Sequence, residues 1–432
     1  MHQFDITIEN LSKIEGHMDL VIKVRDNKVE YVKLEVSENK RFYTQAIRGK
    51  HAVNAPQLMS RICGTCSIAH LLCCIQAVEN ATGIKPSQQT ILLRKLAMYG
   101  LYLRDHALHC YMFSLPDVIG KDSILEFDEN NPKEHELIHQ CFEVKAAGNA
   151  LCTLVAGKAV HAPFPVVGGF IQIPDKKDIK PVIEKLLSVR QAVLELINIF
   201  MPEKFDFTRD TDYVCLTNPD FNFYTGDHIC TSKQLCIPWQ KYGKHLEHQV
   251  IPYSQASGYK FEGQTYMVGA LARINLNKTY LNKKTCKDAK KALDIFPSKN
   301  IFHNNLAQAI EMLHCIDASV EIFNKTDFKK EKIVQAVPKA SIRVGKGVGV
   351  IEAPRGTLYY LVEVDKNGII TNADIVVPTG QNQINIEQDI KTLVQSHLEW
   401  PEDKLRFEIE QLIRAYDPCT SCAAHFLKIN WQ

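Results

Sequence analysis

Three features are missing from this chain, and each absence excludes a class of protein. No stretch approaches the roughly 20 consecutive apolar residues that cross a lipid bilayer. The first residues, MHQFDITIENLSKIEGH, lack the basic segment and apolar run of a secretory signal. The formal net charge of +2 gives no electrostatic reason to bind nucleic acid or an anionic membrane. We therefore expect a cytoplasmic protein with no direct membrane insertion and no nucleic-acid partner.

The chain also lacks internal repeats, low-complexity linkers and a G-x-G-x-x-G fingerprint, so we expect it to bind no dinucleotide itself. It has 432 residues, of which 45% are hydrophobic and 23% charged, as in ordinary globular proteins. This length is sufficient for one large domain over residues 1–432, or for two to three ordinary ones.

Hydrophobic periodicity predicts an α+β fold that is mostly α, with a central buried helical bundle and small peripheral antiparallel sheets. Two hairpin turns are expected, at Asp26-Asn27 and at Asn367-Gly368. A long helix should stop at Pro116, and residues 180–200 should form one continuous helix. The expected regions are a β region at 4–40, a helical core at 64–200, a surface elaboration of loops and short strands at 203–275, a helix at 300–325, a β region at 340–378, and a C-terminal helix with a metal-binding motif at 401–425.

Fourteen cysteines are many for a cytoplasmic chain. Ten of them lack Cys-x-x-Cys spacing, and several, such as Cys73, Cys110 and Cys315, stand among apolar residues. Because buried free cysteine behaves as a small hydrophobe, we expect these ten in the core. In a reducing compartment we expect no disulfides.

The other four cysteines form two Cys-x-x-Cys pairs, Cys63/Cys66 in RICGTC and Cys419/Cys422 in DPCTSC. Most of the chain separates the pairs, whereas local zinc folds place theirs about 15–20 residues apart. The pairs can meet only through the global fold, so a shared site should lie deep inside. Asp417 before the second pair and His425 after it suit a thiolate metal site with proton transfer next to it.

These two motifs and several others resemble, in their residues and in their order along the chain, the motifs of the large catalytic subunit of [NiFe]-hydrogenases. The resemblance covers essentially the whole chain and looks closest to the cytosolic NAD(P)-linked and sulfhydrogenase group. The motifs that carry it are SKIEGH at 12–17, RICGTC at 61–66, RDHALHCY at 104–111, GKAVHAPFPVVGGF at 157–170, EAPRG at 352–356, VVPTGQN at 376–382 and DPCTSCAAH at 417–425.

The resemblance implies a nickel–iron centre held by all four thiolates. Cys63 and Cys419 would be terminal nickel ligands, with Cys419 also counted as catalytic, and Cys66 and Cys422 would bridge to iron. Soft thiolates suit nickel. The resemblance also implies one carbon monoxide and two cyanides on the iron.

Three acids are implied around this centre. Glu15 would transfer the proton that heterolytic cleavage of hydrogen releases, and Asp105 and Asp417 would flank the site. From spacing alone, Glu15 could be a solvated residue at a strand end and Asp417 a turn residue.

Arg355 and Thr379 are implied to donate hydrogen bonds to the two cyanides, and Pro354 to line the same pocket. Without the resemblance, APRG would be an ordinary turn.

A magnesium ion is also implied, with His425 and the backbone carbonyl of Gln383 as ligands. The chain departs from the family here, because Thr44 stands where a glutamate ligand is usual. His106, His109 and His161 are predicted to be hydrogen-bonded core residues, with a supporting role around the centre as the alternative.

The function implied is reversible heterolytic cleavage of molecular hydrogen, with electrons passed to a separate iron–sulfur small subunit and on to flavin and NAD(P) subunits. Nickel-insertion proteins and a maturation protease would complete the site, and the protease would remove residues 426–432; a permanent tail is the alternative. The competing functions are a hydrogen sensor, a non-catalytic homologue, and a structural zinc protein with four cysteine ligands.

Overall fold

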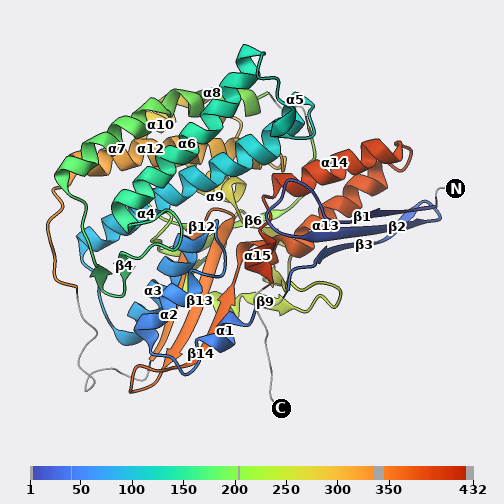
Figure 1. The fold of residues 1–432 in the computed structure, drawn as a ribbon. Coiled ribbons are helices and arrows are strands. Elements are labelled where there is room, and N and C mark those ends of the chain that lie inside the picture. The colour runs from blue at the N-terminus through green and yellow to red at the C-terminus, as the bar shows by residue number, and fades with distance from the viewer. Residues whose placement is uncertain (1–2, 40, 203–204, 334–344, 425–432) are drawn as a thin grey trace.

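The computed structural model describes residues 3–39, 41–202, 205–333 and 345–424, and confirms a mainly helical α+β fold (Figure 1). Long helices lie together in one layer, with small sheets around them. The helices are α1 (Tyr43–Ala46), α2 (Ala55–Met59), α3 (Ser67–Thr82), α4 (Gln88–Ala107), α5 (Leu115–Ile119), α6 (Pro132–Ala156), α7 (Lys176–Ser188), α8 (Arg190–Phe200), α9 (Ala270–Asn277), α10 (Lys283–Asp288), α11 (Lys290–Leu293), α12 (His303–Lys325), α13 (Pro378–Ser396), α14 (Glu402–Ala415) and α15 (Thr420–Ala423).

The strands form several small sheets, most of them antiparallel. Their bounds are β1 (Phe4–Ile8), β2 (Met18–Arg25), β3 (Lys28–Val36), β4 (Pro165–Val166), β5 (Gly169–Phe170), β6 (Asp212–Thr217), β7 (His228–Thr231), β8 (Cys236–Pro238), β9 (Leu246–Gln249), β10 (Gly258–Phe261), β11 (Tyr266–Met267), β12 (Gly345–Ala353), β13 (Gly356–Val364) and β14 (Ile370–Val376).

Both predicted hairpin turns are confirmed. Asp26 and Asn27 join β2 to β3 with positive φ angles of 49° and 60°, the conformation that a two-residue hairpin turn requires. Asn367 and Gly368 lie in the turn between β13 and β14. Buried and partly exposed residues alternate along β2, so one face of the strand packs against the core.

The β12–β13–β14 sheet packs closely against α3, the helix that follows the first cysteine pair. A methyl group at Gly349 would lie 2.3 Å from the carbonyl oxygen of Cys73, so only glycine allows this approach. The connection between β12 and β13 carries Pro354 and Arg355. The close packing therefore positions this connection beside the cysteines.

Two helix predictions are wrong. The long helix does not stop at Pro116 but passes through a π-helical segment, Leu108–Ser114, into α5, and ends at Gly120. Proline is tolerated there because it lies in the first turn of the new segment, where its missing N–H costs little. The expected continuous helix over 180–200 is broken at Val189 into α7 and α8.

The region 203–275 contains the expected loops and short strands, but it is not only a surface elaboration. Strand β6 is buried along most of its length. Val214 and Leu216 of this strand join a second apolar cluster with Val350 and Tyr359 of the β12–β13 pair. The region is thus part of the hydrophobic interior.

The expectation of no disulfides is also wrong. Cys230 and Cys236 are bonded, because they face each other across β7 and β8 with Cα atoms 4.1 Å apart. Of the other eight cysteines outside the two pairs, Cys286 is half-buried and the rest are free and buried, as predicted. No helix among the described residues is long and apolar enough to span a bilayer.

Candidate metal centre

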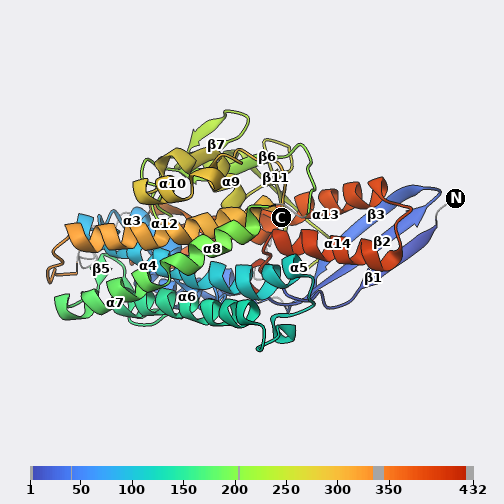
Figure 2. The ribbon, with the colours of Figure 1, turned by 90° about the horizontal axis from the view of Figure 1, so that it is seen from above.

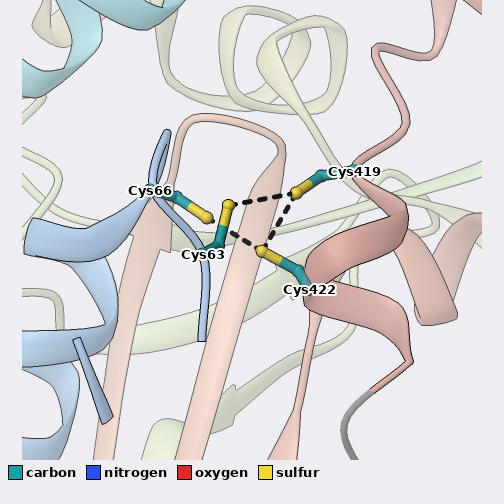
Figure 3. A group of neighbouring side chains, drawn as sticks. All are labelled: Cys63, Cys66, Cys419 and Cys422. Atoms are coloured by element: carbon teal, nitrogen blue, oxygen red, sulfur yellow. Dashed lines mark hydrogen bonds between the residues drawn. The ribbon is translucent and has the colours of Figure 1, made fainter. Parts of the chain in front are cut away.

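The two Cys-x-x-Cys pairs meet in the interior (Figure 3). Cys63 and Cys66 end the loop before α3, whereas Cys419 precedes α15 and Cys422 lies in it. The sulfur of Cys66 lies 2.8 Å from that of Cys422, and the sulfur of Cys63 lies 3.5 Å from that of Cys419. All four sulfurs thus lie together in the interior, where a site shared by the two pairs was expected.

A backbone contact fixes the second pair against the N-terminal segment. Glu15 and Cys419 form a parallel β-bridge, and Thr420 donates both its N–H and its hydroxyl to the carbonyl oxygen of Glu15, each at 3.0 Å. Gly16 makes this possible: its φ is +88°, and a methyl group there would lie 1.7 Å from the hydroxyl oxygen of Thr420. Glycine at this position is therefore a requirement of the site.

The bridge directs the carboxylate of Glu15 at the sulfurs. Its Oε2 lies 3.0 Å from the sulfur of Cys419, and its Oε1 lies 4.0 Å from that of Cys63. The hydroxyl of Ser421 donates to Oε1 at 2.6 Å. Burial raises the pKa of the Glu15 carboxyl group, which favours the protonated form next to the cysteines.

The four sulfurs suit a soft metal cation. Burial raises the pKa of the Cys419 and Cys422 thiols well above their usual range, whereas a hydrogen bond from Cys419 holds the pKa of Cys63 well below it. Four thiolates in this interior would repel one another strongly unless a cation joined them. The donor set and its burial therefore fit a thiolate-bound metal centre.

A small cavity beside the sulfurs is lined by Pro354, Arg355 and Thr379, as well as by three of the cysteines. Thr379 accepts a hydrogen bond from the N–H of Cys419 at 3.0 Å, which leaves its own O–H to donate into the cavity. A hydroxyl, a guanidinium and a proline ring thus face a space next to the metal-binding sulfurs, which fits small acceptor ligands there.

Arg355 is held between two acids, Asp105 and Asp417. Its two terminal nitrogens lie 2.9 Å from a carboxylate oxygen of each. All three side chains are buried. Burial raises the pKa of Asp105, and Arg355 opposes that rise. Gln308 donates to the second oxygen of Asp417 at 2.9 Å, which completes a fixed support for the guanidinium.

Two residues that the sequence analysis did not single out also support the cysteines. Nε2 of His70 lies 3.4 Å from the sulfur of Cys422, and its Nδ1 lies 2.7 Å from the hydroxyl of Tyr360. Arg104 donates to the carbonyl oxygens of Gly64 and Thr65, within the first pair's loop.

A signal for His70 was available in the sequence. It follows Cys66, the N-terminal capping residue of α3, by four residues, which places the two residues about one helical turn apart. Arg104 had no such signal, because its partners are backbone carbonyls of a loop far away in the chain.

The three histidines make hydrogen bonds, as predicted, but only His106 and His109 are buried core residues, whereas His161 is half-buried. His106 contacts Glu311 at 2.9 Å, and His161 contacts the carbonyl oxygen of Ser60 at 3.0 Å. Nδ1 of His109 lies 2.6 Å from the side-chain oxygen of Gln308, so His109 also supports the residue that holds Asp417.

The predicted magnesium site stays a prediction. Thr44 is buried in α1, and the side chain of Gln383 donates to the carbonyl oxygen of Leu34. His425 and the tail 426–432 lie outside the described residues. The described part of the chain gathers one further group of three ligand residues, Asp105, His106 and Asp417, and Arg355 already neutralises its acids.

Comparisons with known proteins agree with this geometry. The family described as nickel-dependent hydrogenase matches residues 41–141 and 217–425. The sulfhydrogenase 1 alpha subunit of Pyrococcus furiosus is 30% identical over 431 residues, which cover 98% of each chain. The NAD-reducing hydrogenase HoxS beta subunit of Cupriavidus necator is 29% identical, over 98% of this chain and 95% of its own.

The fold gives the same result. A crystal structure of an NAD+-reducing [NiFe]-hydrogenase in the H2-reduced state matches with a TM-score of 0.85 and 25% identity, over 98% of this chain and 99% of that one. Four converging cysteines, a family match over most of the chain and this structural match lead to one conclusion: the chain belongs to the nickel-dependent hydrogenase large-subunit family.

Proposed function

We propose that this chain is the catalytic subunit of a [NiFe]-hydrogenase and cleaves molecular hydrogen reversibly into protons and electrons. The observation that carries the proposal is a buried group of four thiols with a carboxylate 3.0 Å from one of them. Heterolytic cleavage needs a base that takes the proton and a metal that takes the electron pair. The carboxylate would be the base, and the four thiolates would hold the metal.

Cys63, Cys66, Cys419 and Cys422 would hold nickel, with Cys66 and Cys422 also bound to an iron that carries one carbon monoxide and two cyanides. When bound, this centre supplies the metal that accepts the electron pair of the H–H bond. The cavity beside the sulfurs would take the cyanides, with hydrogen bonds from Arg355 and Thr379 and a wall formed by Pro354.

The remaining steps belong to side chains of this chain. Glu15 takes the proton at the carboxylate oxygen that faces Cys419, and Ser421 holds the carboxylate in that orientation. Asp105 and Asp417 keep Arg355 fixed over the cavity, so its charge does not have to reorient during the reaction. The Cys419 sulfur is the ligand next to the proton acceptor.

Electrons would leave through other subunits. Apart from the two pairs, the sequence has no Cys-x-x-Cys from which to build an iron–sulfur relay. We infer an iron–sulfur small subunit as the direct partner, and flavin and NAD(P) subunits beyond it, since the names of two relatives describe an NAD-reducing hydrogenase and a sulfhydrogenase. The cytoplasmic location, the magnesium ion, the processing of residues 426–432 and the maturation proteins that would carry it out stay predictions.

Infrared spectroscopy and metal analysis of the purified complex test this function together. We expect carbonyl and cyanide bands, with about one nickel and one iron per chain at the centre. About one tightly held zinc, no nickel and no such bands would instead identify a structural zinc site. Bands and nickel with negligible turnover would favour the hydrogen sensor.

A further inference from the structure

Helix α6 carries two histidines that the hydrogenase function does not use. The sequence HELIH, residues 135–139, places His135 and His139 one helical turn apart. Both side chains are exposed, and α6 lies in the outer part of the helical layer (Figure 2). Their ring centroids are 4.4 Å apart, with an interplanar angle of 61°. The two imidazoles therefore already lie together on the helix surface.

This arrangement suits a divalent transition metal. Two histidines four residues apart on a helix can direct one ring nitrogen each at a common point, as in the His-Glu-x-x-His pattern of zinc enzymes. Zinc, nickel and copper all accept imidazole, and water can fill the remaining positions. Because both rings are exposed, small side-chain rotations can bring their nitrogens to a metal without disturbing the core.

The same motif does not build a peptidase here. The glutamate of such an enzyme must act as a base beside the metal, but the Glu136 carboxylate accepts a hydrogen bond from Gln140 at 3.3 Å. Among the described residues, no third histidine, cysteine or acid completes a ligand group with the two histidines. The site is open to solvent and supplies two protein ligands only.

We propose that His135 and His139 form a surface site for a divalent transition metal such as Zn2+, Ni2+ or Cu2+. The site is separate from the four buried cysteines and stands on one helix. With only two protein ligands it exchanges its metal readily, whereas the buried centre does not. A chelator wash should therefore remove metal bound at this site and leave the buried centre intact.

Calorimetric titration of the chelator-washed complex with Zn2+ tests the proposal, at a mildly alkaline pH that keeps imidazole neutral. We expect about one Zn2+ per chain in addition to the buried centre. His135→Ala and His139→Ala should each weaken binding by at least about tenfold. His228→Ala, which removes another exposed histidine on β7, is the matched control and should change nothing.

The identity of the ligands has a separate readout. Cu2+ bound to the washed complex should give an electron paramagnetic resonance spectrum with coupling to two nitrogens, reduced to one in either single variant. Nickel content of the buried centre should stay unchanged in all variants, which shows that they fold. Absence of Zn2+ binding, undiminished binding in the double variant, or an equal loss in His228→Ala would overturn the proposal.

Discussion

The carboxylate of Glu15 lies 3.0 Å from the sulfur of Cys419 although 404 positions separate the two residues in the chain. A parallel β-bridge between their backbones sets this distance. The main chain therefore brings the acid to the cysteines, and the hydroxyl of Ser421 orients its carboxylate.

Glu15→Gln should separate proton transfer from assembly of the centre. The amide keeps the size of the side chain and can still accept a hydrogen bond from Ser421, but it cannot take up a proton. We expect turnover to fall by about 10²- to 10⁴-fold, with nickel content unchanged. Hydrogen uptake and metal analysis measure the two effects, and Glu9→Gln, at an exposed position, is the control. Unchanged turnover would remove Glu15 from the mechanism.

Gly16→Ala should prevent the second cysteine pair from closing onto the first. The new methyl group would lie 1.7 Å from the hydroxyl oxygen of Thr420, and the positive φ adds strain. Gly49→Ala is a matched control, because Gly49 has a φ of +76° but open space around it. We expect loss of nickel in the first variant and its retention in the second. If both variants retain nickel, the close approach is not essential.

Cys419→Ser should abolish nickel binding and hydrogen uptake. A serine hydroxyl is a harder, far less acidic ligand than a thiol, so the soft donor set is broken. Cys286→Ser is the matched control at a free, half-buried cysteine outside the two pairs. Nickel measured by mass spectrometry should be absent from the first variant and normal in the second; nickel at the normal level in Cys419→Ser would exclude Cys419 as a ligand.

Arg355→Lys should cost both stability and activity. One guanidinium contacts Asp105 and Asp417 together, whereas an ammonium group reaches one carboxylate and leaves the other buried without its partner. We expect a loss of about 3 kcal/mol in unfolding free energy, together with slower turnover. The surface substitution Arg406→Lys, in a pair with Glu402, should be nearly neutral. Equal melting temperatures for the two variants would contradict this account.

His314 should make stability depend on pH. Burial lowers its folded-state pKa from 6.5 to about 4. Because the unfolded state binds the proton more readily, stability is fully present above pH 6.5 and falls as the pH drops toward 4. In His314→Gln the melting temperature should depend less on pH over that range, because the loss of about 3 kcal/mol of stability at the acid end no longer occurs. An unchanged pH profile in this variant would show that other groups dominate.

The cysteine site was predictable because its signal is local. Each pair shows its Cys-x-x-Cys spacing within four residues, and the order of the other family motifs along the chain indicated that the two pairs form one site. The sequence did not predict helix α13, because its first half buries Gln381 and Asn382, which hydrogen-bond to Thr357 and to the backbone of Val268, so its apolar periodicity begins only at Ile386. Polar residues used in this way look like a loop in the sequence.

The disulfide could not be predicted for a different reason. Cys230 and Cys236 become neighbours only through the register of β7 against β8, and strand register is a property of the folded sheet. The contacts of Arg104 with the first pair's loop likewise depend on how α4 packs, which residue types alone do not reveal.

A metal bound by both pairs would also act as a cross-link. It would join Cys63 to Cys419 across 356 positions and so turn nearly the whole chain into one closed loop. By the chain-entropy estimate used for disulfides, closing so long a loop lowers the conformational entropy of the unfolded chain by the equivalent of about 6 kcal/mol. Nickel would thus stabilise the fold as well as take part in the reaction. The metal-free protein should unfold first at its C-terminal segment, and proteases should cleave it there.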